Sequence, residues 1–169
     1  DWNSVPEDYE KAHCLDFYGG DLEGIQEKIP YLKKLGITAI YLNPIFYGAT
    51  VHKYDCLDYF SVDPHFGGDK ALENLCSELH KNGIKIILDV SINHTGIANK
   101  WFNRDGTFFD KSEGAFNNPN CEEREFYFFD KDGNAYPVGK VGNDEVNYFE
   151  PKAIDFEVKE PANDNVNSQ

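Results

Sequence analysis

Basic residues are in short supply in this chain. Lys and Arg together number 16 among 169 residues, against 30 Asp and Glu, which leaves a formal net charge of −14. Because no basic stripe is available to neutralise phosphates, we exclude nucleic acid as a partner. The acidic balance also disfavours an anionic membrane, and it is compatible with neutral substrates such as sugars.

Long apolar runs are missing too, and no segment approaches the length that spans a bilayer. No charged-then-apolar leader opens the chain, so we expect that any secretion signal has been removed or never existed. The cysteines are scattered, without the paired spacing of a zinc site: Cys14, Cys56, Cys76 and Cys121. Reduced thiols favour a cytoplasmic location, with secretion as the alternative.

Signature motifs of several other classes are absent. The chain has no G-x-S-x-G, no Walker loop and no dinucleotide fingerprint. Asp130 to Asn134 superficially suggests calcium, but glycine comes fourth rather than sixth, and Val141 stands where the EF-hand glutamate belongs. We predict a hairpin turn there instead. Asn93-His94-Thr95 matches the N-glycosylation sequon, but a strand end that faces a cleft is a poor glycan site.

The most informative stretch that is present runs from Lys85 to Gly96. Its branched apolar residues predict a strand over 85–92 that is buried on both faces of a parallel sheet. Asp89 lies inside this strand, and Asn93 and His94 follow at its C-terminal end, where α/β proteins gather ligands and catalytic groups. The alternative is a strand that simply ends in a polar turn, with Asp89 satisfied by backbone donors.

An alternation of helices and strands precedes this stretch. Asp21 is expected to cap a helix that Pro30 kinks or breaks, and a strand is expected over 37–42. Asp69 is expected to cap a second helix, which ends at Asn82-Gly83 and leads into the strand over 85–92. Strand, helix and strand make a βαβ unit. This order predicts an α/β sheet or barrel and excludes an all-β fold.

The pattern changes after Gly96. Aromatic residues alternate with turn signals such as Asp105-Gly106 and Asp132-Gly133, which predicts an irregular subdomain of short strands and loops. Residues 157–169 are polar and lack periodicity, which predicts a tail. We therefore expect three parts, residues 1–96, residues 97–156 and residues 157–169.

A second polar loop follows the strand over 37–42 and contains His52, Tyr54 and Asp55. It leaves the same end of the predicted sheet as Asn93 and His94, so the two loops open on one face. Tyrosine offers a sugar ring a flat apolar platform, and His and Asp supply directional hydrogen bonds. The alternative is that the tyrosines, Tyr54 and Tyr59, only pack the loop down.

Four blocks together carry a family resemblance: residues 17–22 (FYGGDL), 40–46 (IYLNPIF), 52–55 (HKYD) and 88–94 (LDVSINH). In this order and spacing they resemble the α-amylase family of glycoside hydrolases, most of all its neopullulanase, cyclomaltodextrinase and maltogenic-amylase branch. The resemblance implies a partial (β/α)8 barrel over residues 1–96, containing its second and third strands with flanking helices. It also implies that residues 97–156 open the protruding B-type loop domain.

The resemblance also implies roles for individual residues. Tyr54 would stack under the sugar at the cleavage subsite, and His94 would hydrogen-bond a hydroxyl of the same sugar. Asp89 would support the catalytic arginine, with His52 and Asp55 as further supporting residues. No cofactor is required; a structural calcium ion would use Gly19, Asp21 and Asn93, although the upstream ligands of such a site have no counterpart here.

The catalytic carboxylates of the family have no match, and we expect the nucleophile and the acid/base beyond the end of the chain. Cys56 also replaces the threonine that commonly follows the Tyr-Asp pair. The function implied is that of a fragment of a retaining hydrolase of α-glucans such as starch, maltodextrin, pullulan or cyclodextrin. The alternatives are a non-catalytic truncated product that binds sugar weakly or pairs with a partner chain, and an unrelated α/β protein. Open strand edges also predict self-association.

Overall fold

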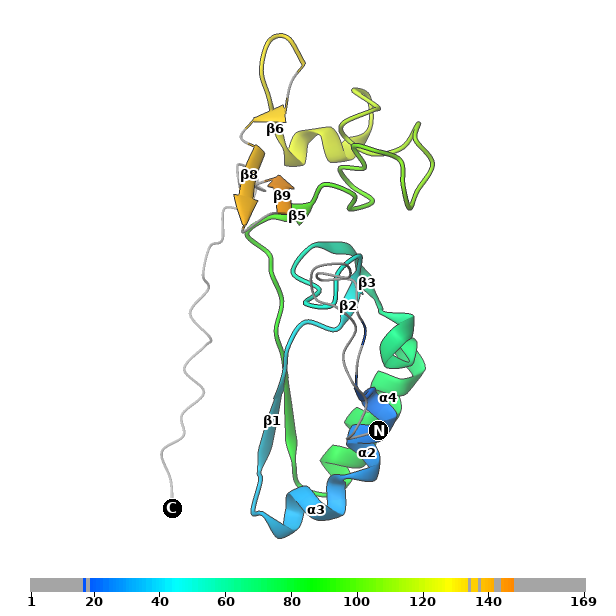
Figure 1. Ribbon diagram of the computed structural model, residues 1–169, viewed down its shortest axis with the longest axis vertical. Helices are drawn as coiled ribbons and strands as arrows, with labels where there is room; N and C mark the ends of the chain where they lie inside the picture. The colour runs from blue at the N-terminus through cyan, green and yellow to red at the C-terminus, as the bar shows by residue number, and fades with distance from the viewer. Residues whose placement is uncertain (1–16, 18, 134, 137, 142–143, 148–169) are drawn as a thin grey trace, which may run out of the picture.

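The structure is a computed structural model, and it describes residues 17, 19–133, 135–136, 138–141 and 144–147 (Figure 1). The predicted tail over 157–169, Cys14 and the Tyr18 position of the first motif lie outside the described residues. Within the described part, no helix is long and apolar enough to cross a membrane.

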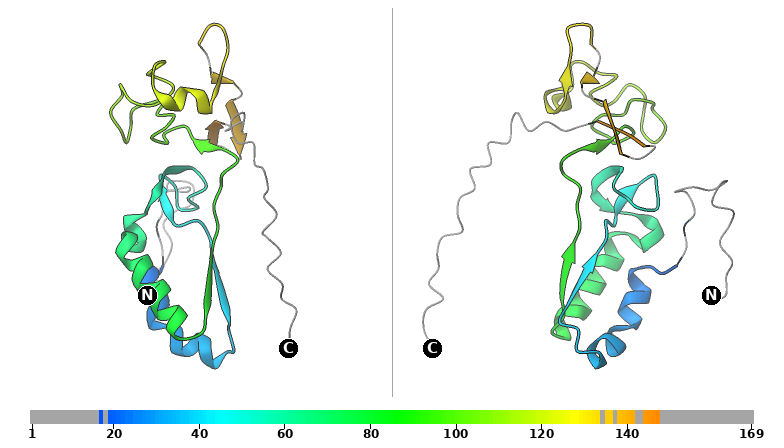
Figure 2. Two further views of the ribbon diagram at one scale, coloured as in Figure 1. Left: turned by 180° about the vertical axis from the view of Figure 1, so that it is seen from behind. Right: turned by 60° about the vertical axis from the view of Figure 1, so that its left-hand side comes forward.

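A parallel pair of strands forms the centre of the first half. β1 (Ala39–Leu42) pairs with β4 (Lys85–Leu88), in a register that places Ala39 opposite Lys85 and Leu42 opposite Leu88. The connection between them includes α4 (Gly68–Lys81), so the predicted βαβ unit is present. Helices α2 (Leu22–Glu27), α3 (Ile29–Lys34) and α4 all lie on one side of this strand pair (Figures 1 and 2).

The first predicted helix is broken into two near Pro30, as the proline predicts. α2 ends at Glu27, Lys28 caps it, and α3 begins at Ile29 with Pro30 in its first turn. Proline is tolerated there because the first backbone N–H groups of a helix have no intrahelical partner. Asp21 caps α2 as expected, since its Oδ1 accepts a hydrogen bond of 2.8 Å from the Gly24 amide.

The N-terminus of α4 differs from its prediction. Gly67, with φ +99°, is the residue before the helix, and Asp69 lies in the first turn, where its charge favours the helix dipole. The Asp69 carboxylate instead accepts the Val62 amide at 2.7 Å. The prediction that Asp69 caps the helix is therefore wrong, because the strand before the helix claims its oxygen. The helix ends at Asn82 and Gly83, as predicted.

The apolar core of this half lies between the helices and the strands. Its most buried members are Leu75 and Leu79, each 0% exposed, which lie on one face of α4. The other buried members come from α2, α3, the connecting loops and the strands: Leu22, Ile29, Ile45, Val62 and Ile84.

The strand over 85–92 is shorter and less buried than predicted. β4 ends at Leu88, and its exposed and half-buried residues alternate. Ile87, Val90 and Ile92 are 49%, 42% and 64% exposed. The prediction of burial on both faces is wrong for the described residues, because the helices cover only one side of the strand pair.

A second pair of strands lies between β1 and α4, in a segment that the sequence predicts to be a polar loop. β2 (Phe46–Gly48) pairs antiparallel with β3 (Cys56–Val62), with register shifts on both sides of Tyr47. The 3₁₀ turn η2 (Pro64–Phe66) then leads to α4. Cys56 and Leu57 are buried in β3, and burial raises the pKa of the Cys56 thiol to about 12. This pairing makes the segment between Gly48 and Cys56 a hairpin loop.

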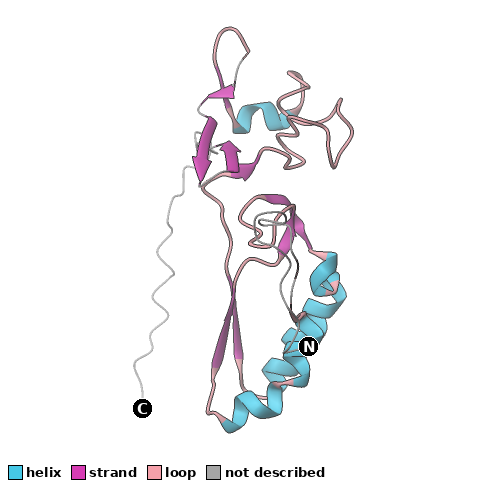
Figure 3. Ribbon diagram, in the orientation of Figure 1, coloured by secondary structure: helices cyan, strands magenta, loops and turns pink. Residues whose placement is uncertain are grey.

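The described residues from Ile97 onward are here called the loop-rich unit. It holds η3 (Glu122–Phe126), β6 (Phe128–Phe129), β7 (Ala135–Tyr136), β8 (Val138–Val141) and β9 (Asp144–Asn147). β9 pairs with β5 (Thr95–Gly96), and the unit lies beyond the ends of β1 and β4 (Figure 3). The predicted hairpin over 130–134 joins β6 to β7, with Gly133 at φ +84°. A separate core of Phe102, Ala115 and Tyr127 holds the unit together.

Candidate functional site

Tyr54 and Asp89 meet at the C-terminal ends of the parallel strands. Asp89 directly follows β4, and its amide donates to the Leu42 carbonyl at the end of β1. The Tyr54 hydroxyl donates to Asp89 Oδ2 at 2.8 Å, across 35 positions of sequence. This hydrogen bond to Asp89 raises the pKa of the Tyr54 hydroxyl, and a similar bond raises that of Tyr41 on β1. Side-chain hydroxyls therefore satisfy Asp89, in place of the backbone donors that the alternative interpretation required.

His94 fastens the two loops together. Its side chain is nearly buried, with the residue 8% exposed, and Nε2 lies 3.0 Å from the Tyr54 carbonyl oxygen. Because a carbonyl oxygen only accepts, this contact places a proton on Nε2. Asn93 Oδ1 accepts from the Ser91 hydroxyl at 3.2 Å and lies 3.2 Å from His94 Nδ1. The predicted residues Tyr54, Asp89, Asn93 and His94 thus belong to one connected group.

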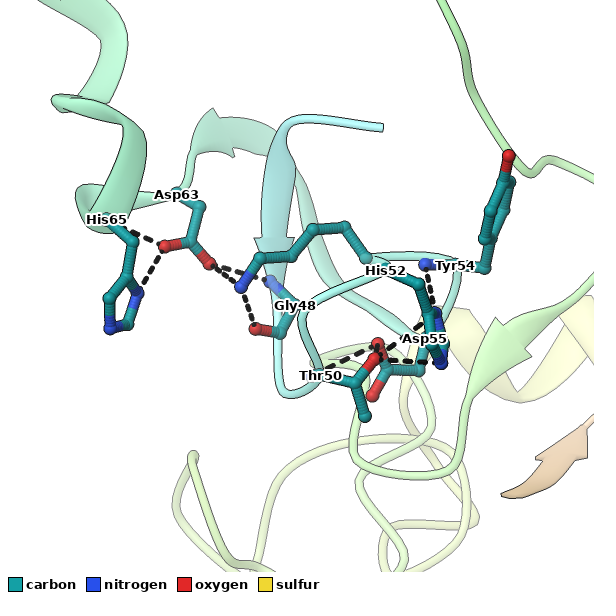
Figure 4. Close-up of polar contacts among 8 residues, drawn as sticks. Gly48, Thr50, His52, Tyr54, Asp55, Asp63 and His65 are labelled. Atoms are coloured by element: carbon teal, nitrogen blue, oxygen red, sulfur yellow. Dashed lines mark hydrogen bonds and ion pairs between the residues drawn. The ribbon is translucent and has the colours of Figure 1, made fainter. Parts of the chain in front are cut away.

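His52 and Asp55 shape the loop on either side of Tyr54. Asp55 Oδ1 accepts from the Thr50 hydroxyl at 2.7 Å, and that hydroxyl lies 3.1 Å from His52 Nε2 (Figure 4). The Tyr54 amide donates to His52 Nδ1 at 3.1 Å. Burial raises the pKa of Asp55, although the hydrogen bonds from Thr50 partly oppose this. These contacts close residues 50–55, here called the tyrosine loop, into a hydrogen-bonded turn.

Lys53 lies between these site residues and points the opposite way. Its backbone has φ +61°, in the left-handed region that a non-glycine residue seldom adopts. The residue is 1% exposed, and Nζ donates to the Gly48 carbonyl at 2.9 Å and to Asp63 Oδ2 at 2.6 Å. A lysine in a loop of polar residues reads as solvent-exposed in the sequence, and this buried ion pair was not predicted.

Asp63 gathers donors from three directions. Besides Lys53, it accepts the Gly48 amide at 3.3 Å and the His65 amide at 2.9 Å (Figure 4). Burial alone raises the pKa of Asp63, but the hydrogen bond from Lys53 and those from the backbone outweigh it, so the pKa lies below its usual value. The His65 ring contacts Asp63 Oδ1 at 2.7 Å and stacks on Phe17 at 4.0 Å. The first motif of the sequence therefore lies against this pair.

An open cavity of about 750 Å³ adjoins the tyrosine loop. Its walls come from α2, β1 and the segment after β1, and they include His52 and Tyr54. Most of the remaining lining is apolar, from residues such as Ile25, Leu32 and Ile40. Tyr54 therefore lies at the boundary between the polar group around Asp89 and an apolar hollow.

Two of the residues predicted to hold calcium use a side-chain oxygen in a local hydrogen bond. Asp21 uses Oδ1 to cap α2, and Asn93 uses Oδ1 within its own turn. Gly19 is exposed, with φ +94°. Among the residues that the structure describes, no three His, Cys, Asp or Glu side chains gather to bind a metal ion.

The comparison with protein families agrees with this arrangement. The family model described as "Alpha amylase, catalytic domain" matches residues 3–160. The chain belongs to the α-amylase family. This family consists of glycoside hydrolases that need no cofactor, and the predicted family resemblance is confirmed.

Individual relatives place the chain more closely within the α-amylase family. It is 49% identical over 96 residues to the intracellular maltogenic amylase of Bacillus subtilis strain 168, which covers 57% of this chain and 16% of that protein. It is 53% identical over 87 residues to the cyclomaltodextrinase of Thermoanaerobacter pseudethanolicus, covering 52% of this chain and 15% of that protein. The chain thus spans about one sixth of the length of these relatives.

Solved structures of the α-amylase family show the same fold. The cyclic α-maltosyl-(1→6)-maltose hydrolase of Arthrobacter globiformis, in its ligand-free form, matches with a TM-score of 0.61 and 28% identity, over 80% of this chain and 31% of that one. These neighbours are TIM-barrel enzymes, and the described residues form an α/β portion of such a barrel. The α/β fold class is confirmed at this level.

Gly96 allows the two loops of the site to approach closely. A Cβ atom at this position would lie 2.8 Å from the Asp55 carbonyl oxygen and 3.0 Å from its carbonyl carbon. Gly96→Ala should displace the tyrosine loop and lower the free energy of unfolding by about 1–3 kcal/mol, measured by chemical denaturation. The control is Gly20→Ala, because no atom lies within 4 Å of a Cβ there. Equal effects of the two changes would show that the close approach is unimportant.

Proposed function

We propose that this chain is part of a retaining glycoside hydrolase that acts on α-glucans, and that its described residues form part of the donor-sugar subsite. One observation carries the proposal. Tyr54, Asp89 and His94 come from two motifs far apart in sequence, and they are joined by hydrogen bonds of 2.8 and 3.0 Å at the C-terminal ends of β1 and β4. That edge is where barrel enzymes place their active sites.

Tyr54 is suited to hold a sugar ring. The residue is 40% exposed, and its hydroxyl is held by Asp89, so the orientation of the ring is set before a ligand arrives. A pre-oriented aromatic face binds a sugar without the entropic cost of ordering the side chain. His94 supports the same loop through the Tyr54 carbonyl, and we propose that it also presents its ring edge to a sugar hydroxyl.

The catalytic carboxylates are proposed to stand elsewhere in the parent protein. Retaining hydrolysis needs two carboxyl groups about 5 Å apart on either side of the scissile bond. Asp55 and Asp89 are each engaged by hydroxyl groups of this chain, from Thr50 and Tyr54. We assign them to supporting roles, together with His52.

The division of the chain follows the same proposal. Residues 1–96 would belong to the catalytic barrel, and residues 97–156 would form the protruding B-type subdomain, which the separate core around Phe102 supports. We infer that further strands of the parent barrel cover the exposed side chains of Tyr41 and Ile87, and that the chain alone associates with itself there. A cytoplasmic location is proposed from the thiols of the described cysteines, Cys56, Cys76 and Cys121, which are free.

Binding of a short α-glucan tests the proposal. Maltotriose titrated into the chain should bind weakly, and Tyr54→Ala should reduce its affinity at least about tenfold, because the aromatic platform is removed. Isothermal titration calorimetry measures the affinity. Tyr31→Ala serves as the control, since Tyr31 lies 59% exposed on α3, away from the tyrosine loop. Affinity that is unchanged in Tyr54→Ala would refute the subsite, and so would absence of binding to the unmodified chain.

A further inference from the structure

Tyr59 lies directly behind the turn that carries His94. It belongs to β3, and its hydroxyl oxygen lies 2.7 Å from the Ser91 carbonyl oxygen and 2.8 Å from the His94 carbonyl oxygen. These two carbonyls sit at the two ends of the turn from Ser91 to His94. A hydroxyl with one hydrogen can donate to either carbonyl, so it links both ends of the turn to β3.

The position of the Tyr59 ring is set from the other side. The ring stacks on Trp101 with centroids 5.5 Å apart, and Trp101 in turn meets Phe126 edge-on at 5.8 Å. Burial raises the pKa of the Tyr59 hydroxyl well above its usual value, so the hydroxyl remains a donor at any working pH. Tyr59 is therefore a fixed donor between the loop-rich unit and the Ser91–His94 turn.

The contacts continue from this turn to the sugar platform. Tyr59 holds the His94 carbonyl, and the His94 ring holds the Tyr54 carbonyl at 3.0 Å. Tyr54 is the aromatic platform of the proposed subsite. A change at the Tyr59 hydroxyl would thus reach the platform through one intermediate residue.

We propose that Tyr59 is a positioning residue for the sugar subsite, which sets the orientation of the His94 ring and through it the Tyr54 loop. This inference rests on the proposed function. The simpler view is that the Tyr59 hydroxyl only adds stability by fastening β3 to the neighbouring turn. The two views differ in whether the His94 ring itself responds when the hydroxyl is removed.

Tyr59→Phe removes the hydroxyl and keeps the ring that stacks on Trp101. The NMR signals of the His94 imidazole, identified by their loss in His94→Gln, should shift in Tyr59→Phe, because the backbone of the turn is released. Maltotriose affinity should fall about three- to tenfold, the range expected for one lost hydrogen bond. Tyr31→Phe is the matched control and should change neither readout, since Tyr31 lies on α3.

A double-mutant cycle with His94→Gln separates positioning from general stabilisation. If Tyr59 acts through His94, adding Tyr59→Phe to His94→Gln should cause no further loss of affinity. Additive losses together with unshifted His94 signals would overturn the proposal. If the unmodified chain binds no maltotriose, the proposed function fails, and with it the role of Tyr59 in sugar binding. The His94 signals then still decide whether Tyr59 sets the orientation of the His94 ring: a shift in Tyr59→Phe supports that part of the proposal, and unchanged signals overturn it.

Discussion

Lys53→Met should lower the free energy of unfolding by about 3–5 kcal/mol, the range for removing one partner of a buried ion pair. Lys53 and Asp63 are 1% and 0% exposed, and their charged atoms are 2.6 Å apart. Methionine fills the space of the lysine stem but leaves Asp63 as a buried charge without its cation. The Gly48 carbonyl also loses its donor. Urea denaturation measures the change.

A surface ion pair of the same length provides the control. Lys81 and Glu78 on α4 are also 2.6 Å apart, but their side chains are 65% and 37% exposed. Lys81→Met should therefore change the free energy of unfolding by less than about 1 kcal/mol. Similar losses for the two variants would show that burial of the Lys53 pair has no special energetic role.

Acid provides a second readout of the same pair. The pKa of Asp63 is lowered in the folded protein, so the ionised carboxylate adds stability above its unfolded pKa. That contribution is lost as the pH falls through the lower, folded pKa. In Lys53→Met the hydrogen bond from lysine is gone, so burial raises the pKa of Asp63 towards or above its unfolded value. The acid-induced loss of stability through Asp63 should therefore be smaller than in the unmodified protein, or absent. Thermal unfolding between pH 7 and strongly acidic pH compares the two proteins.

The part of the fold that the sequence predicts is the part set by local patterns. Pro30 marks the break between α2 and α3, and the glycine after Asn82 marks the end of α4. Apolar residues recur at spacings of three or four along α4, at Leu72, Leu75, Cys76 and Leu79, and this face packs on the core, with Leu75 and Leu79 buried and the other two half-buried. Each of these features depends on residues within one or two helical turns, so sequence periodicity is enough to find it.

The features of the fold that could not be predicted from the sequence depend on contacts between segments far apart in the chain. The burial of β4 is governed by what covers each face of the sheet, and the branched residues after Lys85 carry no information about that. Lys53 looks like a surface residue until Asp63 is brought within 2.6 Å by the β2–β3 pairing. The order His52, Lys53 and Tyr54 gives no signal of this, because side chains alternate between two faces only in an extended strand, and Lys53 lies in a loop with φ +61°.

In the candidate site, sequence motifs likewise identify individual residues but not the contacts that depend on pairing between distant segments. Sequence motifs identify Tyr54, Asp89 and His94, since each is a chemically suitable residue beside a strand end. They do not reveal that the His94 ring contacts the Tyr54 backbone, or that Tyr59 holds the turn from behind. Such contacts join positions 32 to 40 residues apart, and they require both the parallel pairing of β1 with β4 and the packing of β3 beside β5.

Phe102→Ala should destabilise the loop-rich unit by about 3–5 kcal/mol, the usual cost of emptying a fully buried aromatic site. Phe102 is 0% exposed and packs on Tyr127, with centroids 4.9 Å apart, and on Phe116 at 5.5 Å. Its cluster shares no residue with the cluster around Leu75 and Leu79. We therefore expect the loss to be confined to the loop-rich unit.

Residue-resolved hydrogen exchange measures where that loss falls. The amides of Ala115 and Phe116, which bond to the carbonyls of Trp101 and Phe102, should exchange much faster in Phe102→Ala. Amides within α4 should keep their protection. Phe108→Ala, at a position 45% exposed, is the matched control and should leave both sets nearly unchanged. Faster exchange in α4 to the same degree would show that the two cores unfold as one cooperative unit, and that the boundary near residue 97 separates no independent subdomain.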